Sequence, residues 1–170
     1  IRNQANTFSI AETNILYVNN TIGVVAHTGN FTISTWIYIN SLNGAQNQVI
    51  LGKAGATSNK EYLLYVSAGL DQVVFDLSTN GSAAGTRAVA ASNGALLTGS
   101  WYNIVAWQSG NNAVGVSVNL SANSTAYTIA VNTSNNQFII ADQDTGGSSA
   151  HMLEGRVDET GIWTRMITPA

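Results

Sequence analysis

Apolar and polar residues alternate along much of this chain with the two-residue period of a β-strand. The clearest run covers residues 31–39, where one face holds Phe31, Ile33, Thr35, Ile37 and Ile39, and the other holds Thr32, Ser34, Trp36 and Tyr38. Similar runs rich in β-branched and aromatic residues predict strands at 48–53, 61–66, 72–77, 101–108, 113–118, 124–129, 136–141 and 152–163. No window of 11 residues keeps the three- and four-residue apolar spacing of an amphipathic helix.

The segments between these runs carry turn residues. Asn-Gly pairs begin at Asn43, Asn80 and Asn93, and Gly146-Gly147 precedes the last run. Strands that follow one another at this spacing are typical of an all-β sandwich or barrel. We find no internal repeat and no linker, so we predict a single domain over residues 1–170 that is part of a longer polypeptide.

Composition narrows the classes of function. Charged residues make up only 9% of the chain and the net charge is −3, so a nucleic-acid partner is not expected. Asn, Ser, Thr and Gly supply 69 of the 170 residues, which predicts a surface of neutral hydrogen-bonding groups. The absence of Cys excludes disulfides and thiolate metal sites. No apolar run approaches the roughly 20 residues of a membrane span, so membrane insertion is not expected either.

Three stretches in order resemble motifs of one known family. They are the strand beginning Phe31-Thr32-Ile33-Ser34, the strand Trp101-Tyr102-Asn103-Ile104 with Gly115-Val116-Ser117-Val118-Asn119 after it, and the segment from Leu153 to Trp163. Together they resemble the LamG-like jelly rolls of the concanavalin A-like lectin and glucanase superfamily. The resemblance implies two curved antiparallel sheets packed face to face, and it implies core positions for Trp36, Trp101 and Trp163.

Glucanases of this superfamily carry acids spaced two apart on one strand. The nearest candidates here are Glu154, Asp158 and Glu159. In a regular strand, Glu154 and Asp158 share a face about 13 Å apart, and Glu159 points the other way. That separation exceeds the distance between the two carboxylates of either hydrolytic mechanism. We therefore predict that the chain is not an enzyme. The two histidines, His27 and His151, lie in no metal-binding or nucleophile motif.

One loop has residues that suit a metal ion. Asp142 and Asp144 stand two apart and are followed by Gly146 and Gly147. Two carboxylates on a flexible backbone fit calcium, which takes six to eight oxygen ligands. The loop does not follow the EF-hand pattern, because Leu153 stands where the bidentate Glu is needed. An ordinary acidic turn and a structural Ca²⁺ bound by Asp142 and Asp144 both remain open.

Aromatic side chains offer flat faces on which the C–H face of a sugar ring can pack. The aromatic residues that we assign as candidate ligand-binding residues are Tyr62, Tyr65, Tyr102 and Trp107. We expect a non-catalytic recognition module that binds a glycan or another surface polymer, located outside the cell or on its surface. The alternative is a structural or assembly domain of a virion, such as a capsid decoration or tail fibre, or of a surface layer. Its partners would be neighbouring virion or surface proteins.

Overall fold

A computed structural model describes residues 6–8, 16–18, 29–54, 60–78, 87–110, 113–127, 132–134, 136–142 and 151–167. These residues contain twelve β-strands. They are β1 (Asn6–Phe8), β2 (Leu16–Val18), β3 (Phe31–Ile39), β4 (Gln48–Lys53), β5 (Tyr62–Val66), β6 (Val73–Ser78), β7 (Arg87–Ala91), β8 (Trp101–Ser109), β9 (Ala113–Val118), β10 (Ser121–Ala126), β11 (Phe138–Ile140) and β12 (Gly155–Trp163).

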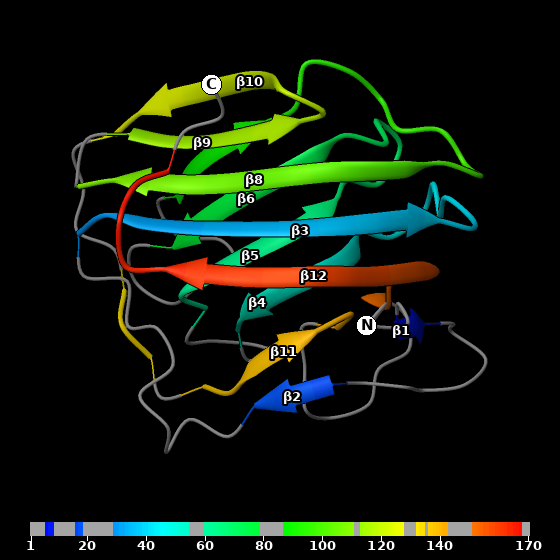
Figure 1. Ribbon diagram of the computed structural model, residues 1–170, viewed down its shortest axis with the longest axis horizontal. Helices are drawn as coiled ribbons and strands as arrows, with labels where there is room; N and C mark the ends of the chain where they lie inside the picture. Colours follow the sequence, from blue (N-terminus) through cyan, green and yellow to red (C-terminus); the bar gives the residue numbers. More distant parts are fainter. Residues whose placement is uncertain are drawn as a thin grey trace.

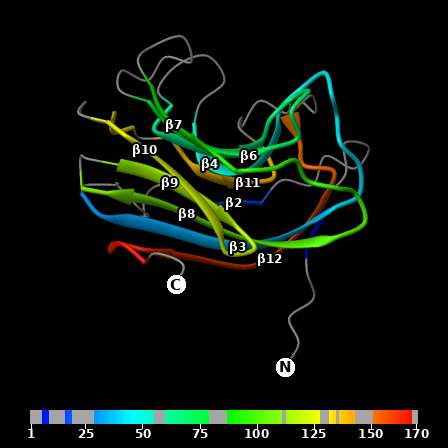
Figure 2. The same cartoon turned by 90° about the horizontal axis from the view of Figure 1, so that it is seen from above.

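The strands form two antiparallel sheets of six strands each. Sheet A has the order β1-β12-β3-β8-β9-β10, and sheet B has the order β2-β11-β4-β5-β6-β7. The sheets lie face to face, as Figure 2 shows from above, and Figure 1 looks onto the outer face of sheet A with sheet B behind it. The predicted fold, an all-β two-sheet antiparallel jelly roll, is confirmed. Among the described residues we find no helix with the length and hydropathy needed to cross a membrane.

The core fills the space between the two sheets. The alternation predicted for β3 is observed, because Phe31, Ile33 and Ile37 expose 1% of their surface or less and belong to the main core cluster. Aromatic rings join the sheets, since the centroid of Phe31 on β3 lies 5.1 Å from that of Tyr62 on β5 and 6.4 Å from that of Phe75 on β6. Burial of one face of a strand fixes its register in such a sandwich, because a shift of one residue would move the apolar side chains out of the core.

Most predicted strands agree with the structure to within a few residues. β3, β4 and β9 have the predicted bounds, whereas β10 begins three residues earlier than predicted and β12 begins at Gly155. The structure adds β1, β2 and β7, which the sequence analysis did not assign. These three strands are three to five residues long.

Candidate functional site

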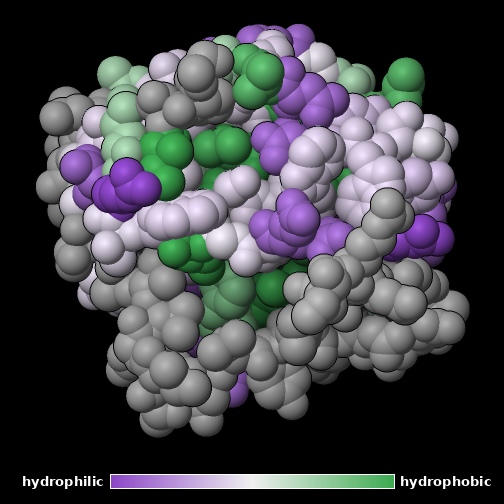
Figure 3. All heavy atoms as spheres, in the orientation of Figure 1, coloured by the Kyte–Doolittle hydropathy of each residue, from purple (hydrophilic) through white to green (hydrophobic). Residues whose placement is uncertain are grey.

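All four tryptophans of the chain lie on the outer face of sheet A. In the register of the sheet, Trp36 pairs with Asn103 on β8, while Trp101 pairs with Tyr38 on β3. The other two, Trp107 and Trp163, both pair with Thr32 from opposite sides. Since Thr32, Trp36 and Tyr38 alternate with the buried residues of β3, these partners share its outward face. Figure 3 shows this face as a mixture of pale, hydrophobic and hydrophilic groups.

Three of these tryptophans are partly open to solvent. Trp36, Trp101 and Trp163 expose 37%, 38% and 37% of their surface. The expectation that they fill the core is therefore wrong. The physical reason is that aliphatic side chains such as Ile33, Ile37 and Ile104 occupy the inward positions of these strands.

Trp107 differs from the other three because it is covered. It exposes only 6% of its surface, and its ring lies over Gly115 on the neighbouring strand β9. The chain after β12 crosses β3 and β8 at this end of the face (Figure 1). There the Thr32 hydroxyl donates to the Arg165 carbonyl at 2.8 Å and accepts from the Ile167 amide at 2.8 Å. The opposite end of the face, around Trp36, stays open.

That open end holds a groove of about 370 Å³. Its described lining consists of Trp36, Trp101, Asp158 and Glu159, from the adjacent strands β3, β8 and β12. Asp158 pairs directly with Trp36 across the sheet, which brings a carboxylate beside an indole. The groove therefore combines two partly exposed aromatic rings with two acidic side chains.

An irregularity in β12 explains why two consecutive acids line the same groove. The register with β3 shifts between Asp158 and Gly161, and Glu159 has the positive φ of 47°. The Glu159 amide donates to Asp158 Oδ1 at 2.8 Å. The Thr35 and Thr160 hydroxyl oxygens lie 2.8 Å apart, which ties the bulge to β3. The assumption that β12 is regular, with Glu159 on the opposite face, is therefore wrong, because a β-bulge redirects the side chain.

Tyr38 and Arg156 continue the open end of the face next to the groove. The ring centroids of Tyr38 and Trp101 are 5.5 Å apart. The guanidinium of Arg156 lies over the Tyr38 ring at 5.3 Å from its centroid, a cation–π arrangement. These contacts hold Trp101 in place in the groove and Tyr38 beside it, and they bring the positive charge of Arg156 onto the Tyr38 ring.

The structure places the four predicted ligand-binding residues elsewhere. Tyr62 is fully buried between the sheets, and Tyr65 and Trp107 expose 7% and 6% of their surface, so no ring face of these three is open to a sugar. Tyr102 is partly exposed and lines a second hollow of about 260 Å³ beside Ser92 to Leu96. Its hydroxyl accepts from the Leu97 amide at 2.7 Å and donates to the Leu97 carbonyl at 3.1 Å.

The predicted calcium ligands are only partly described. Asp142 is fully buried, and Asp144 lies outside the described residues, as does His27. His151 is described, with Nδ1 3.4 Å from the Asn47 carbonyl oxygen. Within the described part of the chain, no three His, Cys, Asp or Glu side chains are placed to hold a metal ion. The calcium site stays a prediction.

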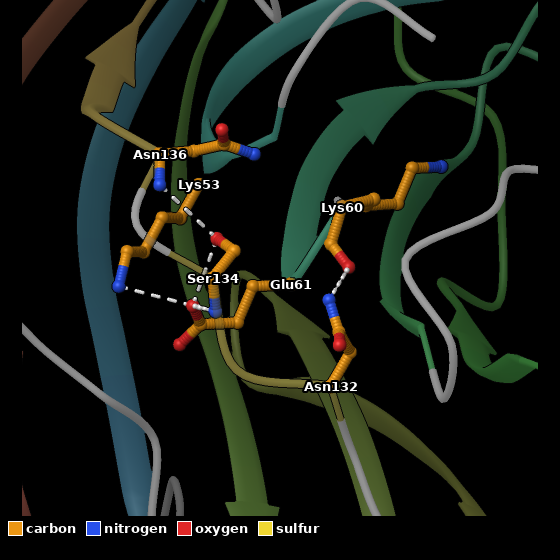
Figure 4. A network of polar contacts seen from close by, with 6 residues as sticks. All are labelled: Lys53, Lys60, Glu61, Asn132, Ser134 and Asn136. Atoms are coloured by element: carbon orange, nitrogen blue, oxygen red, sulfur yellow. Dashed lines mark hydrogen bonds and ion pairs between the residues drawn. The ribbon is translucent and has the colours of Figure 1, made fainter. Parts of the chain in front are cut away.

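Both lysines of the chain are buried in ion pairs at one end of sheet B. Lys53 Nζ lies 3.0 Å from Glu61 Oε2, and Lys60 Nζ lies 3.2 Å from Asp76 Oδ2. The same Glu61 oxygen accepts from the amide and the hydroxyl of Ser134 at 2.8 and 3.1 Å. Figure 4 shows Glu61 between Lys53 and Ser134, so this network ties the segment before β11 to the sheet. Its groups satisfy one another, and we assign them a structural role.

Comparisons with known proteins agree with this architecture. The family model described as the concanavalin A-like lectin/glucanases superfamily matches residues 11–170. The chain belongs to this superfamily. A search of curated proteins finds no match to this concanavalin A-like domain.

Solved structures resemble the domain at low sequence identity. A putative carbohydrate binding protein from Bacteroides ovatus has a TM-score of 0.65 at 17% identity, covering 91% of this chain and 41% of that one. Domains LG4-5 of the mouse laminin alpha1 chain give 0.58 at 18% identity, covering 79% and 35%. A heptameric SAP-like pentraxin from Limulus polyphemus gives 0.61 at 15% identity, covering 84% and 67%. The concanavalin A-like domain thus spans well under half of the first two chains, and all three likenesses concern the fold.

Proposed function

We propose that this domain is a non-catalytic module that binds carbohydrate in the groove on the outer face of sheet A. The observation that carries the proposal is the pair of partly exposed rings, Trp36 and Trp101, in a groove with polar groups at its edge. Binding sites for small molecules combine aromatic lining with a few polar groups that fix orientation. Aromatic side chains also bury a large area, so two of them can supply most of the binding free energy of a small interface.

The position of the two acids supports binding rather than hydrolysis. Hydrolysis of a glycosidic bond needs two carboxyl groups on opposite sides of the bond. Asp158 and Glu159 are consecutive residues on the same strand, so they approach the groove from one side. Asp158 also accepts a hydrogen bond from the backbone of Glu159, which occupies one of its oxygens.

The name of one structural neighbour supports a sugar as the ligand. The Bacteroides ovatus protein is described as a putative carbohydrate binding protein, and it has the same fold. A receptor on a cell surface or an extracellular polymer would display such a ligand, so we place this domain outside the cell.

The direct test is a glycan array probed with the domain and three variants. Trp36→Ala and Trp101→Ala each remove one aromatic face of the groove and should weaken binding about tenfold, a loss of about 1.4 kcal/mol. Trp163→Ala is the matched control, because Trp163 is equally exposed on the same face but does not line the groove. Hydrolysis products are assayed in the same samples.

Each outcome distinguishes between the possible functions. Binding that is lost in both groove variants and kept in Trp163→Ala supports the proposal. Silence of the wild-type domain across the array, with and without calcium, refutes carbohydrate binding. In that case, self-association or stable binding to neighbouring virion or surface proteins, lost on mutation of the same tryptophans, would support the assembly role. Release of shortened glycans would show an enzyme.

A further inference from the structure

The residues that line the groove indicate the charge of the ligand as well as its class. Its described lining contains two indole rings and two carboxylates, with no Lys or Arg among them. The face of an indole attracts a cation through the ring quadrupole. A carboxylate at the edge of the same groove attracts the same charge. Both kinds of lining therefore favour a ligand with a positive group.

The nearest cation on β12 does not cancel this preference. Arg156 stands two residues before Asp158 on the same face of the strand, and its guanidinium lies over the ring of Tyr38. This contact places the guanidinium on Tyr38, its partner across the sheet, whereas Asp158 pairs with Trp36. Two carboxylates against one nearby guanidinium leave the described lining of the groove with a net negative charge.

The bulge in β12 is what adds the second carboxylate. Without it, Glu159 would alternate to the inner face, and Asp158 alone would face Trp36. Glu159 is exposed and lines the groove, so its carboxylate can contact a bound ligand directly. Glu159 is therefore the residue that should decide the charge of the ligand.

We propose that the groove selects sugar units that carry a free, protonated amine. This inference rests on the proposed function, since it names the class of carbohydrate bound at the same site. The C–H face of the sugar ring packs on Trp36 or Trp101, and the ammonium group lies toward Asp158 and Glu159. Acetylation of the amine removes the charge and leaves the sugar ring unchanged, so it separates the contribution of ring stacking from that of the ammonium group.

The experiment compares two ligands that differ only in that charge. The probes are an oligosaccharide of β-linked glucosamine and its fully N-acetylated form, titrated into the domain by calorimetry. At low salt the free-amine form should bind about tenfold more tightly, because an exposed ion pair and a cation–π contact each contribute modestly. The difference should shrink as salt is added, since the Debye length falls to about 10 Å at 0.1 M.

The variants identify the residue responsible. Glu159→Gln keeps the shape of the side chain and should lower the ratio of the two affinities to about threefold or less. Asp71→Asn is the matched control, because it removes the same charge from the turn between β5 and β6 in sheet B and should leave the ratio unchanged. If Glu159→Gln fails to fold, Asp158→Asn and the salt dependence of the wild-type ratio test the same idea.

The failure of this inference is separable from failure of the proposed function. Equal affinity for the two oligosaccharides, or a ratio that Glu159→Gln and Asp158→Asn leave unchanged, overturns the amine preference while Trp36-dependent glycan binding stands. Binding of neutral glycans alone also overturns it. A lysine-containing peptide that binds through Trp36 more tightly than either sugar overturns it in favour of a protein ligand. No glycan binding at all refutes both proposals.

Discussion

Replacing Gly115 with Ala should destabilise the domain although it adds a single methyl group. A Cβ at this position would lie 2.1 Å from Cζ2 and 2.2 Å from Cε2 of Trp107. Non-bonded carbons prefer about 3.5–4.0 Å, so the indole must move by more than 1 Å. Its freedom to move is small, because Trp107 exposes only 6% of its surface.

The magnitude follows from two opposing terms. Overpacking a filled site costs about 1–3 kcal/mol, and expelling the indole altogether would approach the about 3–5 kcal/mol of a Trp→Ala change. Against this, Ala is better than Gly within a strand by about 0.5–1 kcal/mol. Because the overlap is severe, we take the upper end of the overpacking cost, and after subtracting the gain we expect Gly115→Ala to lower the free energy of unfolding by about 2 kcal/mol.

A double-mutant cycle in urea, followed by circular dichroism, measures the effect. Trp107→Ala alone should cost about 3–5 kcal/mol. In that background the methyl group at position 115 meets no ring, so adding Gly115→Ala should be neutral or stabilise by up to about 1 kcal/mol. Gly44→Ala is the control, because nothing lies within 4 Å of a Cβ there. A loss below about 1 kcal/mol for Gly115→Ala, or an equal loss with Trp107 absent, refutes the packing described for this pair.

Three further predictions concern a buried ion pair, a buried tyrosine and the predicted calcium site. Lys53→Met removes the cation from the buried Glu61 carboxylate and should lower the free energy of unfolding, measured in urea, by about 3–5 kcal/mol. Adding Glu61→Leu should recover most of that loss, and equal stability of the single and double variants would contradict the prediction. Burial raises the pKa of Tyr127 to about 12, so its contribution to stability is complete below pH 10 and is lost between pH 10 and 12. Absorbance at 295 nm should show that this tyrosine ionises only near pH 12, and the free energy of unfolding of Tyr127→Phe should fall less steeply over this pH range. If calcium binds at Asp142 and Asp144, a chelator should lower the melting temperature of the wild type but not of the double Asn variant, and an unmoved wild-type curve rules the site out.

The sequence predicts the sheets well because their pattern is local. Burial of every second residue, as in Phe31, Ile33 and Ile37, is written directly into the chain. The same alternation places Trp36 with Thr32 and Ser34 on the polar face. The resemblance to family motifs implied instead that Trp36 lies in the core. In the structure Trp36 lies on the outer face, as the alternation predicts.

The groove could be predicted only in part. The bulge in β12 has no local signal, because the residue with positive φ is Glu159 rather than Gly or Asn. The meeting of Trp36, Trp101 and Asp158 depends on which strands become neighbours, and alternation says nothing about strand order. The burial of Tyr62 likewise depends on the opposite sheet, since it packs on Phe31.

The ion pairs that bury both lysines also change how the domain reacts chemically. The lysine side chains expose 4% and 11% of their surface, so their amines are shielded from an acylating reagent while the domain is folded. Unfolding would release both at once, so acylation of the Lys53 and Lys60 side chains, followed by mass spectrometry, counts molecules that have opened. The native lysines of this chain therefore report unfolding without any engineered residue.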